Sequence, residues 1–198
     1  VLLLGFGVIS AVVVFRKIVQ IVSCHRSLCA LIDQGDPCQR KIENQKLADA
    51  LKNQRAKILV SDVAQSPMAA YLRTILIPKN LVELLSQDEF EAIVSHDLEH
   101  LRSNDRFFMF LRPPGSTLFW WVPTRWWLKR VDQDQELSAD ASVRHYSLDA
   151  TALASALVKI AGKRCRSEPV NFCAFAAGKV HSLLVRLQIA LDPLATPL

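Results

Sequence analysis

The sequence lacks the cysteine pattern of a disulfide-bonded protein or of a four-cysteine zinc protein. It contains five cysteines among 198 residues, an odd number, and no Cys-x-x-Cys pair. Neither a complete disulfide framework nor a four-cysteine zinc site fits this pattern. We therefore expect mostly reduced thiols and a cytosolic compartment.

A large excess of charge of one sign is also absent. The net charge is +5 and the isoelectric point is about 9.1. This balance suits an anionic membrane surface or an acidic partner, but it is too small to imply nucleic acid, and no nucleic-acid motif is present. With 51% hydrophobic residues and a mean hydropathy of +0.18, the chain is too apolar for a disordered protein and large enough for one core.

An apolar run opens the sequence at Val1–Phe15. As a helix rising about 1.5 Å per residue it spans roughly 22 Å, less than the ~30 Å hydrocarbon core of a bilayer. We therefore expect residues 1–23 to be the last part of a transmembrane helix whose beginning is missing, rather than a helix buried in a soluble core. Basic residues follow the run and place the rest of the chain in the cytoplasm, whereas a signal peptide would need them before it: Arg16, Lys17, Arg26, Arg40 and Lys41.

The next part of the sequence predicts one helix and a small sheet. Glu43–Ala56 has the pattern of a polar amphipathic helix, and Lys57–Asp62 and Ala69–Ile77 have that of two strands. Pro78 ends the second strand. No internal repeat is present.

Helices dominate the rest of the chain. Ser86-Gln87-Asp88-Glu89 has the form of a capping box, so a long helix should begin at residue 87. Further helices are expected over residues 132–146, over residues 149–161 with Asp149 as cap and Gly162 as stop, and over residues 179–191.

A tryptophan-rich segment lies at residues 107–128. Prolines interrupt it at Pro113, Pro114 and Pro123, so no single membrane-spanning helix fits there. We expect the segment to lie at the membrane interface, because indole suits the boundary between acyl chains and headgroups. The alternative is an aromatic core or oligomer contact. The tryptophans are Trp120, Trp121, Trp126 and Trp127, and the cations beside them are Arg125, Lys129 and Arg130.

A metal-binding pattern lies on the helix that begins at residue 87. His96-Asp97-Leu98-Glu99-His100 places two imidazoles one turn apart on one helical face, where their nitrogens can converge on one ion. Zinc is the usual occupant, and a catalytic zinc needs a third protein ligand and an open position. Glu136, on a later helix, can supply that ligand. Asp140, one turn further on, can accept the second N–H of a ligating histidine.

This arrangement resembles the membrane-embedded gluzincin metallopeptidases, which carry His-Glu-x-x-His on one helix and Glu-x-x-x-Asp on another. The closest pattern is that of the beta-lactam sensor/antirepressor peptidase family, with the HtpX and CAAX-prenyl protease families second. The order of strand, proline, zinc helix, tryptophan-rich stretch and glutamate motif matches from Ser66-Pro67 to Gly162. The resemblance implies a zinc ion held by His96, His100 and Glu136.

One position departs from the family pattern. The family has Glu after the first histidine, where it takes a proton from the attacking water and passes it to the leaving amine, whereas this chain has Asp97. The aspartate carboxylate would fall about 1.5 Å short, and a displacement of about 1 Å can cost roughly a hundredfold in rate. Glu99 is the alternative base on helical geometry, and the family position favours Asp97.

Other residues are candidates by resemblance. His181 and Arg186 resemble a His…Arg segment of HtpX-like relatives in which a cation can stabilise the oxyanion, although their spacing is one residue short of that pattern; an ordinary amphipathic helix is the alternative. The strand Ala69–Ile77 would pair with an extended substrate through Tyr71, Arg73 and Ile75. A second metal cluster is disfavoured by its irregular spacing, at Cys24, His25, Cys29 and Cys38.

The sequence thus predicts a mainly helical α+β fold, with a small sheet over a gluzincin-type zinc helix and the end of a transmembrane helix before it. Residues 24–198 would form a zinc endopeptidase at the cytoplasmic membrane face, acting on membrane-associated protein or peptide substrates and contacting lipid but not nucleic acid. The alternatives are a pseudopeptidase that binds zinc and acts through a partner, and a membrane scaffold without metal.

Overall fold

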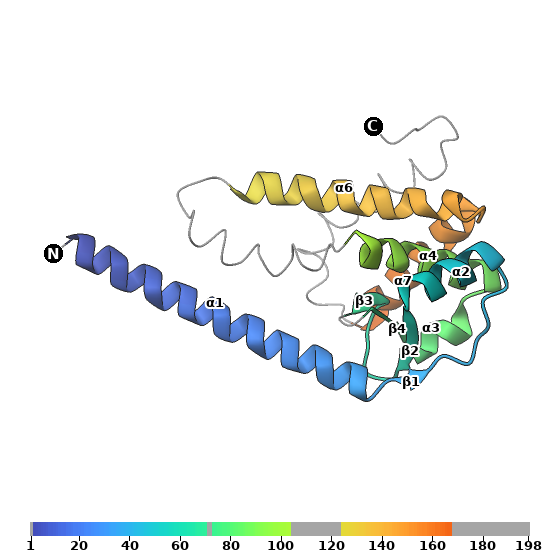
Figure 1. The fold of residues 1–198 in the computed structure, drawn as a ribbon, viewed down its shortest axis with the longest axis horizontal. Coiled ribbons are helices and arrows are strands. Elements are labelled where there is room, and N and C mark those ends of the chain that lie inside the picture. Colours follow the sequence, from blue (N-terminus) through green and yellow to red (C-terminus); the bar gives the residue numbers. More distant parts are fainter. Residues whose placement is uncertain (1, 71–72, 104–123, 168–198) are drawn as a thin grey trace.

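The structure is a computed structural model that describes residues 2–70, 73–103 and 124–167. It confirms a mainly helical α+β fold with one four-stranded sheet (Figure 1). In chain order the elements are α1 (Leu2–Asp33), β1 (Asp36–Pro37), α2 (Gln45–Gln54), β2 (Lys57–Ser61), β3 (Met68–Ala70), β4 (Thr74–Pro78), α3 (Lys79–Leu84), α4 (Gln87–Arg102), α6 (Thr124–His145) and α7 (Ala150–Ser167).

The sheet is mixed, with strand order β1-β2-β4-β3. β2 and β4 run parallel, and β1 and β3 each run antiparallel to their neighbour. Every residue of β4 is buried because this strand has a partner on both sides. The predicted strand at Lys57–Asp62 is confirmed as β2, and Pro78 ends β4 as expected.

The prediction of one strand over Ala69–Ile77 is wrong. Ala70 pairs with Thr74 in antiparallel register, so the chain reverses between β3 and β4. Arg73 has a φ of 57°, in the left-handed region. The sequence hid this reversal because no glycine, proline or asparagine stands between the two strands to mark a turn.

The predicted helix over Glu43–Ala56 is confirmed as α2. Its first turn is capped by Asn44, whose side-chain oxygen accepts a hydrogen bond from the Leu47 N–H at 3.1 Å. The helix ends at Arg55, which adopts the left-handed conformation with a φ of 51°. Leu47 and Leu51 point from α2 into the core.

The capping box at the start of α4 forms as predicted. Ser86 Oγ accepts from the Glu89 N–H at 3.3 Å, and Glu89 Oε2 accepts from the Ser86 N–H at 2.8 Å. From Glu89 to Glu99 every residue of α4 is buried, because α2, α6, α7 and the sheet pack around it (Figure 1). The polar side chains of α4 are therefore enclosed by protein.

Two later helices are longer than expected. The helix predicted over residues 132–146 begins at Thr124, and the helix predicted over residues 149–161 runs to Ser167. Asp149 caps α7 by accepting from the Thr151 N–H at 2.9 Å. The prediction that Gly162 stops this helix is wrong: a glycine ends a helix by adopting positive φ, and Gly162 does not. The helix predicted over residues 179–191 lies outside the described residues.

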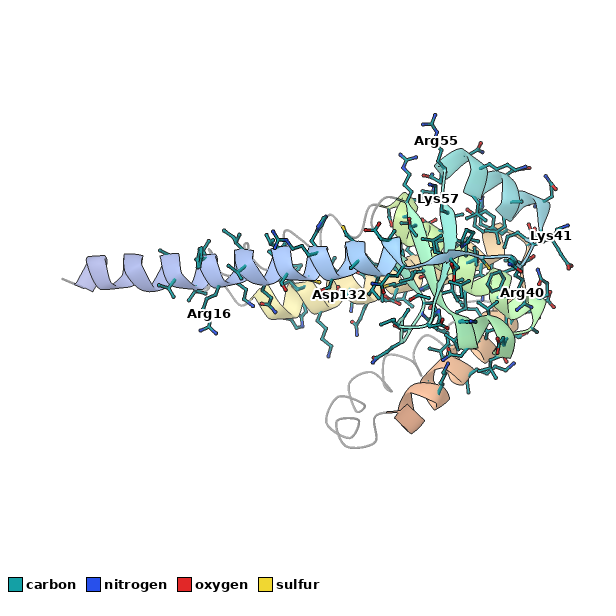
Figure 2. The ribbon with its side chains drawn as sticks, turned by 90° about the horizontal axis from the view of Figure 1, so that it is seen from below. Arg16, Arg40, Lys41, Arg55, Lys57 and Asp132 are labelled. Atoms are coloured by element: carbon teal, nitrogen blue, oxygen red, sulfur yellow. The ribbon has the colours of Figure 1, made fainter. Side chains whose placement is uncertain are left out.

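Helix α1 extends away from the rest of the molecule (Figure 1), and Arg16 projects from its side (Figure 2). None of its side chains over residues 11–33 is buried, so this part does not form a buried core helix. Its last turns pack on the sheet, where Leu28, Leu31 and Ile32 contact a cluster that includes Leu76. Within the described ranges, no helix combines the length and the apolar character needed to cross a membrane.

Trp126 and Trp127 lie in the first turn of α6. They are 66% and 63% exposed, and their rings contact each other edge to face at 5.0 Å. The aromatic-core alternative is therefore wrong for this pair. Trp120, Trp121 and the proline-interrupted part of the segment lie outside the described residues.

Candidate metal centre

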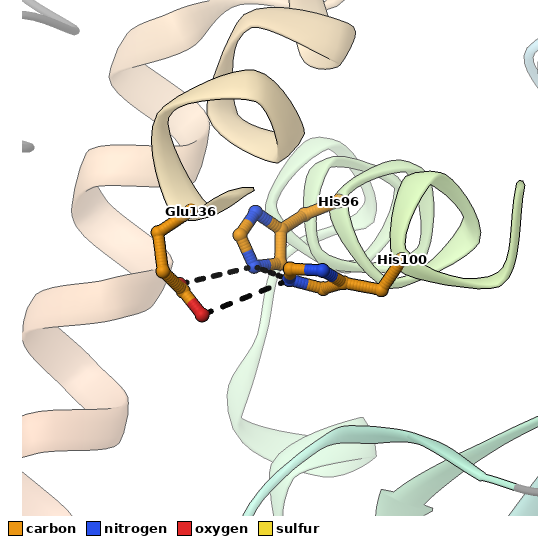
Figure 3. A group of neighbouring side chains, drawn as sticks. All are labelled: His96, His100 and Glu136. Carbon is orange, nitrogen blue, oxygen red and sulfur yellow. Dashed lines mark hydrogen bonds and ion pairs between the residues drawn. The ribbon is translucent and has the colours of Figure 1, made fainter. Parts of the chain in front are cut away.

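The two histidines of α4 face the same point. His96 and His100 lie one turn apart, and their Nε2 atoms are 3.2 Å from each other (Figure 3). The two rings are nearly perpendicular, with 4.8 Å between their centroids. The helix thus directs one nitrogen of each ring into a shared space.

Glu136 approaches this space from α6. Its two oxygens lie 3.8 Å from the nearest histidine nitrogens, Oε2 from His96 Nε2 and Oε1 from His100 Nε2 (Figure 3). The Glu136 side chain remains 39% exposed, so the centre is reachable from solvent on that side.

Asp140 lies next to the ring nitrogen of His96 that faces away from His100 and Glu136. Its Oδ1 lies 2.9 Å from His96 Nδ1, and its side chain is 8% exposed. At this distance the carboxylate favours the tautomer with the proton on Nδ1, which leaves Nε2 with its lone pair toward Glu136 and His100. The structure thus places Asp140 where the sequence predicted a residue that orients a ligand.

A hydrogen-bonded contact fixes α6 on α4 beside the site. Ser142 Oγ donates to the Ala139 carbonyl at 2.7 Å and lies 3.3 Å from the Ser95 carbonyl, one residue before His96. Both serines are buried. This contact sets the register in which Glu136 and Asp140 meet the histidines.

The residues fit a tetrahedral zinc ion. Two nitrogens that share such an ion at about 2.0–2.1 Å lie roughly 3.3–3.4 Å apart, close to the observed 3.2 Å between the Nε2 atoms. Two histidines and one glutamate are a known ligand set of catalytic zinc. Among the described residues, these three form the one group of His, Cys, Asp and Glu side chains that could hold a metal ion.

The two candidate bases differ in their surroundings. Both are buried on α4, Asp97 at 5% exposed and Glu99 at 7%. Arg102 forms a bidentate ion pair with the Glu99 carboxylate: Nε donates to Oε2 at 2.9 Å and Nη2 donates to Oε1 at 2.8 Å. This two-point ion pair raises the pKa of Arg102. Both oxygens of Glu99 are therefore engaged, which favours Asp97 as the base.

Sequence reasoning missed the pairing of Glu99 with Arg102. The spacing of three residues on a helix was the available signal, since an acid and a base so placed are surface neighbours. Tyr146, the residue directly after α6, lies close enough to interact electrostatically with Glu99 and Arg102. Burial raises the pKa of its phenol, and the nearby Glu99 charge raises it further.

The predicted substrate strand is placed differently. Ile75 lies fully buried on β4, which has partners on both sides, and Arg73 lies in the turn before it. Neither residue is on an open edge of the sheet, so their prediction as strand-pairing residues is wrong. Tyr71, His181 and Arg186 lie outside the described residues.

The cysteines form no second metal cluster in the part of the chain that the structure describes. Cys24, Cys29 and Cys38 are free thiols there, as the odd cysteine count led us to expect. Cys29 Sγ lies 3.6 Å from His25 Nδ1, one turn away on α1.

Comparison with known protein families gives a match over most of the chain. A family model described as BlaR1 peptidase M56 matches residues 1–190, a span that includes both helices of the metal centre. No curated protein matches the chain.

Proposed function

Because the chain belongs to the BlaR1 peptidase M56 family, we propose that it is a zinc-dependent endopeptidase acting at the cytoplasmic face of a membrane. The family indicates a peptidase with a protein substrate, and it is membrane-associated. The observation that carries the proposal is the convergence of His96, His100 and Glu136, with their ligand atoms within 4.8 Å of one another.

The three ligands and their support have separate roles. His96, His100 and Glu136 would hold zinc, and Asp140 keeps the proton of His96 on Nδ1 so that Nε2 is available. The bound ion would supply Lewis acidity, which polarises the peptide carbonyl and makes water a stronger nucleophile.

Asp97 is proposed as the general base. Its carboxylate takes a proton from the attacking water as the new C–O bond forms, and it then gives that proton to the leaving nitrogen as the C–N bond breaks. Asp97 is one methylene shorter than the family's glutamate, so the transfer is expected to be slow. The engagement of Glu99 by Arg102 supports this assignment.

The substrate is proposed to bind along β3. In the described part of the chain β3 is an outer strand of the sheet, and it contacts α4, which carries the histidines. An extended peptide that adds a strand there would form main-chain hydrogen bonds beside the metal centre. β3 thus replaces Ile75 and Arg73 in this role.

The membrane placement is a further part of the proposal. Residues 1–23 are proposed as the end of a membrane helix, residues 24–198 as the peptidase domain and residues 107–128 as its interfacial segment. Large apolar side chains are exposed on the outer part of α1, among them Phe15, Ile18 and Val19. The exposure of Trp126 and Trp127 on α6 supports the same placement.

Casein cleavage tests the enzymatic proposal. The full chain in detergent or bilayers should cleave casein, and a chelator should abolish cleavage until zinc is restored. His181 and Arg186 are proposed to stabilise the oxyanion, so Arg186→Met should lower kcat while zinc content is unchanged. Chelator-resistant cleavage would contradict the zinc mechanism.

A pseudopeptidase is the second candidate, and Asp97 is the observation that favours it. If reach alone limits the base, Asp97→Glu should raise casein hydrolysis and leave zinc content unchanged. Equal or lower activity in Asp97→Glu would support a zinc-binding signalling protein that acts through a partner.

A further inference from the structure

We propose that a basic cluster at one end of the sheet, made of Lys52, Arg55, Lys57 and Arg73, binds an acidic segment of the polypeptide substrate. The inference rests on the peptidase function proposed above and names a substrate class for it. None of the four residues belongs to the metal centre.

Backbone contacts bring these cations together. The Lys57 N–H donates to the Arg73 carbonyl at 2.9 Å, and Arg73 Nη1 donates to the Gln54 carbonyl at 2.9 Å. Lys57, two residues after Arg55, pairs with Thr74, the residue after Arg73, so the end of α2 and the turn before β4 lie against each other. Lys52 stands in the last turn of α2.

In the part of the chain that the structure describes, no ion pair neutralises the charge of this cluster. All four side chains are exposed, and the nearest acidic residue in the sequence is Asp49, one turn before Lys52 on α2, whose Oδ1 accepts a hydrogen bond from Gln45. Within the described ranges, no carboxylate lies within ion-pair distance of these four residues. At physiological ionic strength exposed charges act over about 8 Å, and cations carried on hydrogen-bonded neighbouring segments add to one positive field.

The position of the cluster relates it to β3. Ala70, the last residue of β3, pairs with Thr74, directly after Arg73. Neighbouring strands lie about 4.8 Å apart, so a substrate strand on the outer edge of β3 would pass within reach of the long Arg73 side chain. Arg55 and Lys57 lie on the far side of β4 from β3, so they would attract the substrate through their electrostatic field and not by direct contact. A substrate segment that extends past Ala70 therefore meets positive charge.

The orientation of the cluster favours a peptide over a lipid surface. Figure 2 shows Arg55 and Lys57 at one end of the sheet, where α2 meets β2, whereas α1, with its exposed apolar side chains, runs away from the sheet in a different direction. A bilayer contacted by the outer part of α1 would not face the two labelled cations.

Two fluorogenic peptides with the same apolar centre test the inference. One carries Glu on both flanks of the centre and the other carries Gln. The wild-type chain should cleave the Glu peptide with the higher kcat/KM, and Arg55→Gln with Lys57→Gln should lower that value roughly threefold to tenfold, mainly through KM. The double variant should cleave the Gln peptide with the same kcat/KM as the wild type. Raising the salt concentration from about 50 to about 500 mM should reduce the preference of the wild type for the Glu peptide.

The control variant, Lys41→Gln with Lys79→Gln, removes two exposed cations elsewhere. It should leave the kcat/KM values for the Glu and the Gln peptide unchanged. Equal cleavage of the two peptides by the wild type would overturn the inference while the peptidase function stands. If neither peptide nor casein is cleaved, the proposed function fails, and fluorescence anisotropy of the same peptides decides the inference: it stands only if the Arg55/Lys57 variant binds the Glu peptide more weakly. If the Arg55/Lys57 variant binds anionic vesicles more weakly than the wild type but binds the Glu peptide equally well, the inference is overturned in favour of a lipid surface.

Discussion

The imidazole of His96 is held from two sides. Asp140 lies against its Nδ1, and Glu136 and His100 face its Nε2. A carboxylate behind a ligating histidine fixes the ring orientation and raises its basicity. The zinc affinity of the proposed site is therefore expected to depend on Asp140, which would not contact the ion.

Asp140→Asn tests this dependence. The amide can still reach His96 but no longer favours the Nδ1–H tautomer as a carboxylate does, so zinc affinity should fall by roughly tenfold to a hundredfold. A competition titration against a zinc chelator measures the change. Asp134→Asn, at an exposed position paired with Arg130, is the matched control and should bind zinc as the wild type does. Unchanged affinity in Asp140→Asn would refute the role.

The two acids of the histidine motif give a second prediction at this scale. Because both oxygens of Glu99 are bound to Arg102, Glu99→Gln should leave the rate of casein hydrolysis within the same order of magnitude. Asp97→Asn should lower kcat by about a hundredfold or more, since it removes the proposed base. The reverse ranking of the two variants would make Glu99 the base.

At the scale of elements, α4 is tied to its neighbours by carboxylates. The Glu89 carboxylate accepts hydrogen bonds from Lys159 Nζ at 2.7 Å and from the Ser155 hydroxyl, both on α7. It also accepts from the Ser86 N–H. Burial alone would raise the pKa of this carboxyl. The hydrogen bonds from Lys159, Ser155 and Ser86 outweigh burial and lower the pKa from its usual 4.5 to about 2.

This shift gives a pH-dependent contribution to stability. The charged carboxylate stabilises the fold above about pH 4.5, and the contribution is lost as the pH falls toward 2. Glu89→Gln should therefore lower the free energy of unfolding by roughly 1–3 kcal/mol at pH 7, and its deficit should shrink below pH 4.5. Urea unfolding of the two chains between pH 3 and pH 7 measures the difference. A deficit that does not change with pH would contradict the assignment.

Local signals predicted the starts of α2, α4 and α7 better than the turns, whereas α6 begins eight residues before its predicted start. The side chains that begin α4 make their hydrogen bonds within four residues, so the sequence alone contains the information. The reversal between β3 and β4 is set instead by pairing with β2 and by packing on α4, which no local pattern around Arg73 records.

At the scale of the whole molecule, the candidate metal centre combines residues of two helices that are far apart in sequence. The two-histidine turn could be placed on one face from spacing alone. The approach of Glu136 depends on how α6 packs on α4, through contacts such as Ser142 with Ser95, and sequence spacing does not determine this. Family resemblance supplied the pairing, and the geometry now supports it.

The membrane placement makes a prediction at this scale. If Trp126 and Trp127 lie at the lipid interface, brominated lipids should quench the tryptophan emission of the chain in reconstituted bilayers. Replacing both by Phe should remove part of the quenching. Emission that brominated lipids do not quench would refute the interfacial placement.

Zinc content tests the central claim most directly. The purified full chain should carry about one zinc per molecule, measured by mass spectrometry of the elements against protein concentration. Glu136→Gln should lose most of the metal, and His96→Ala should lose nearly all of it, while the Asp134→Asn control retains it. Full zinc content in folded His96→Ala would contradict the metal centre on which the account depends.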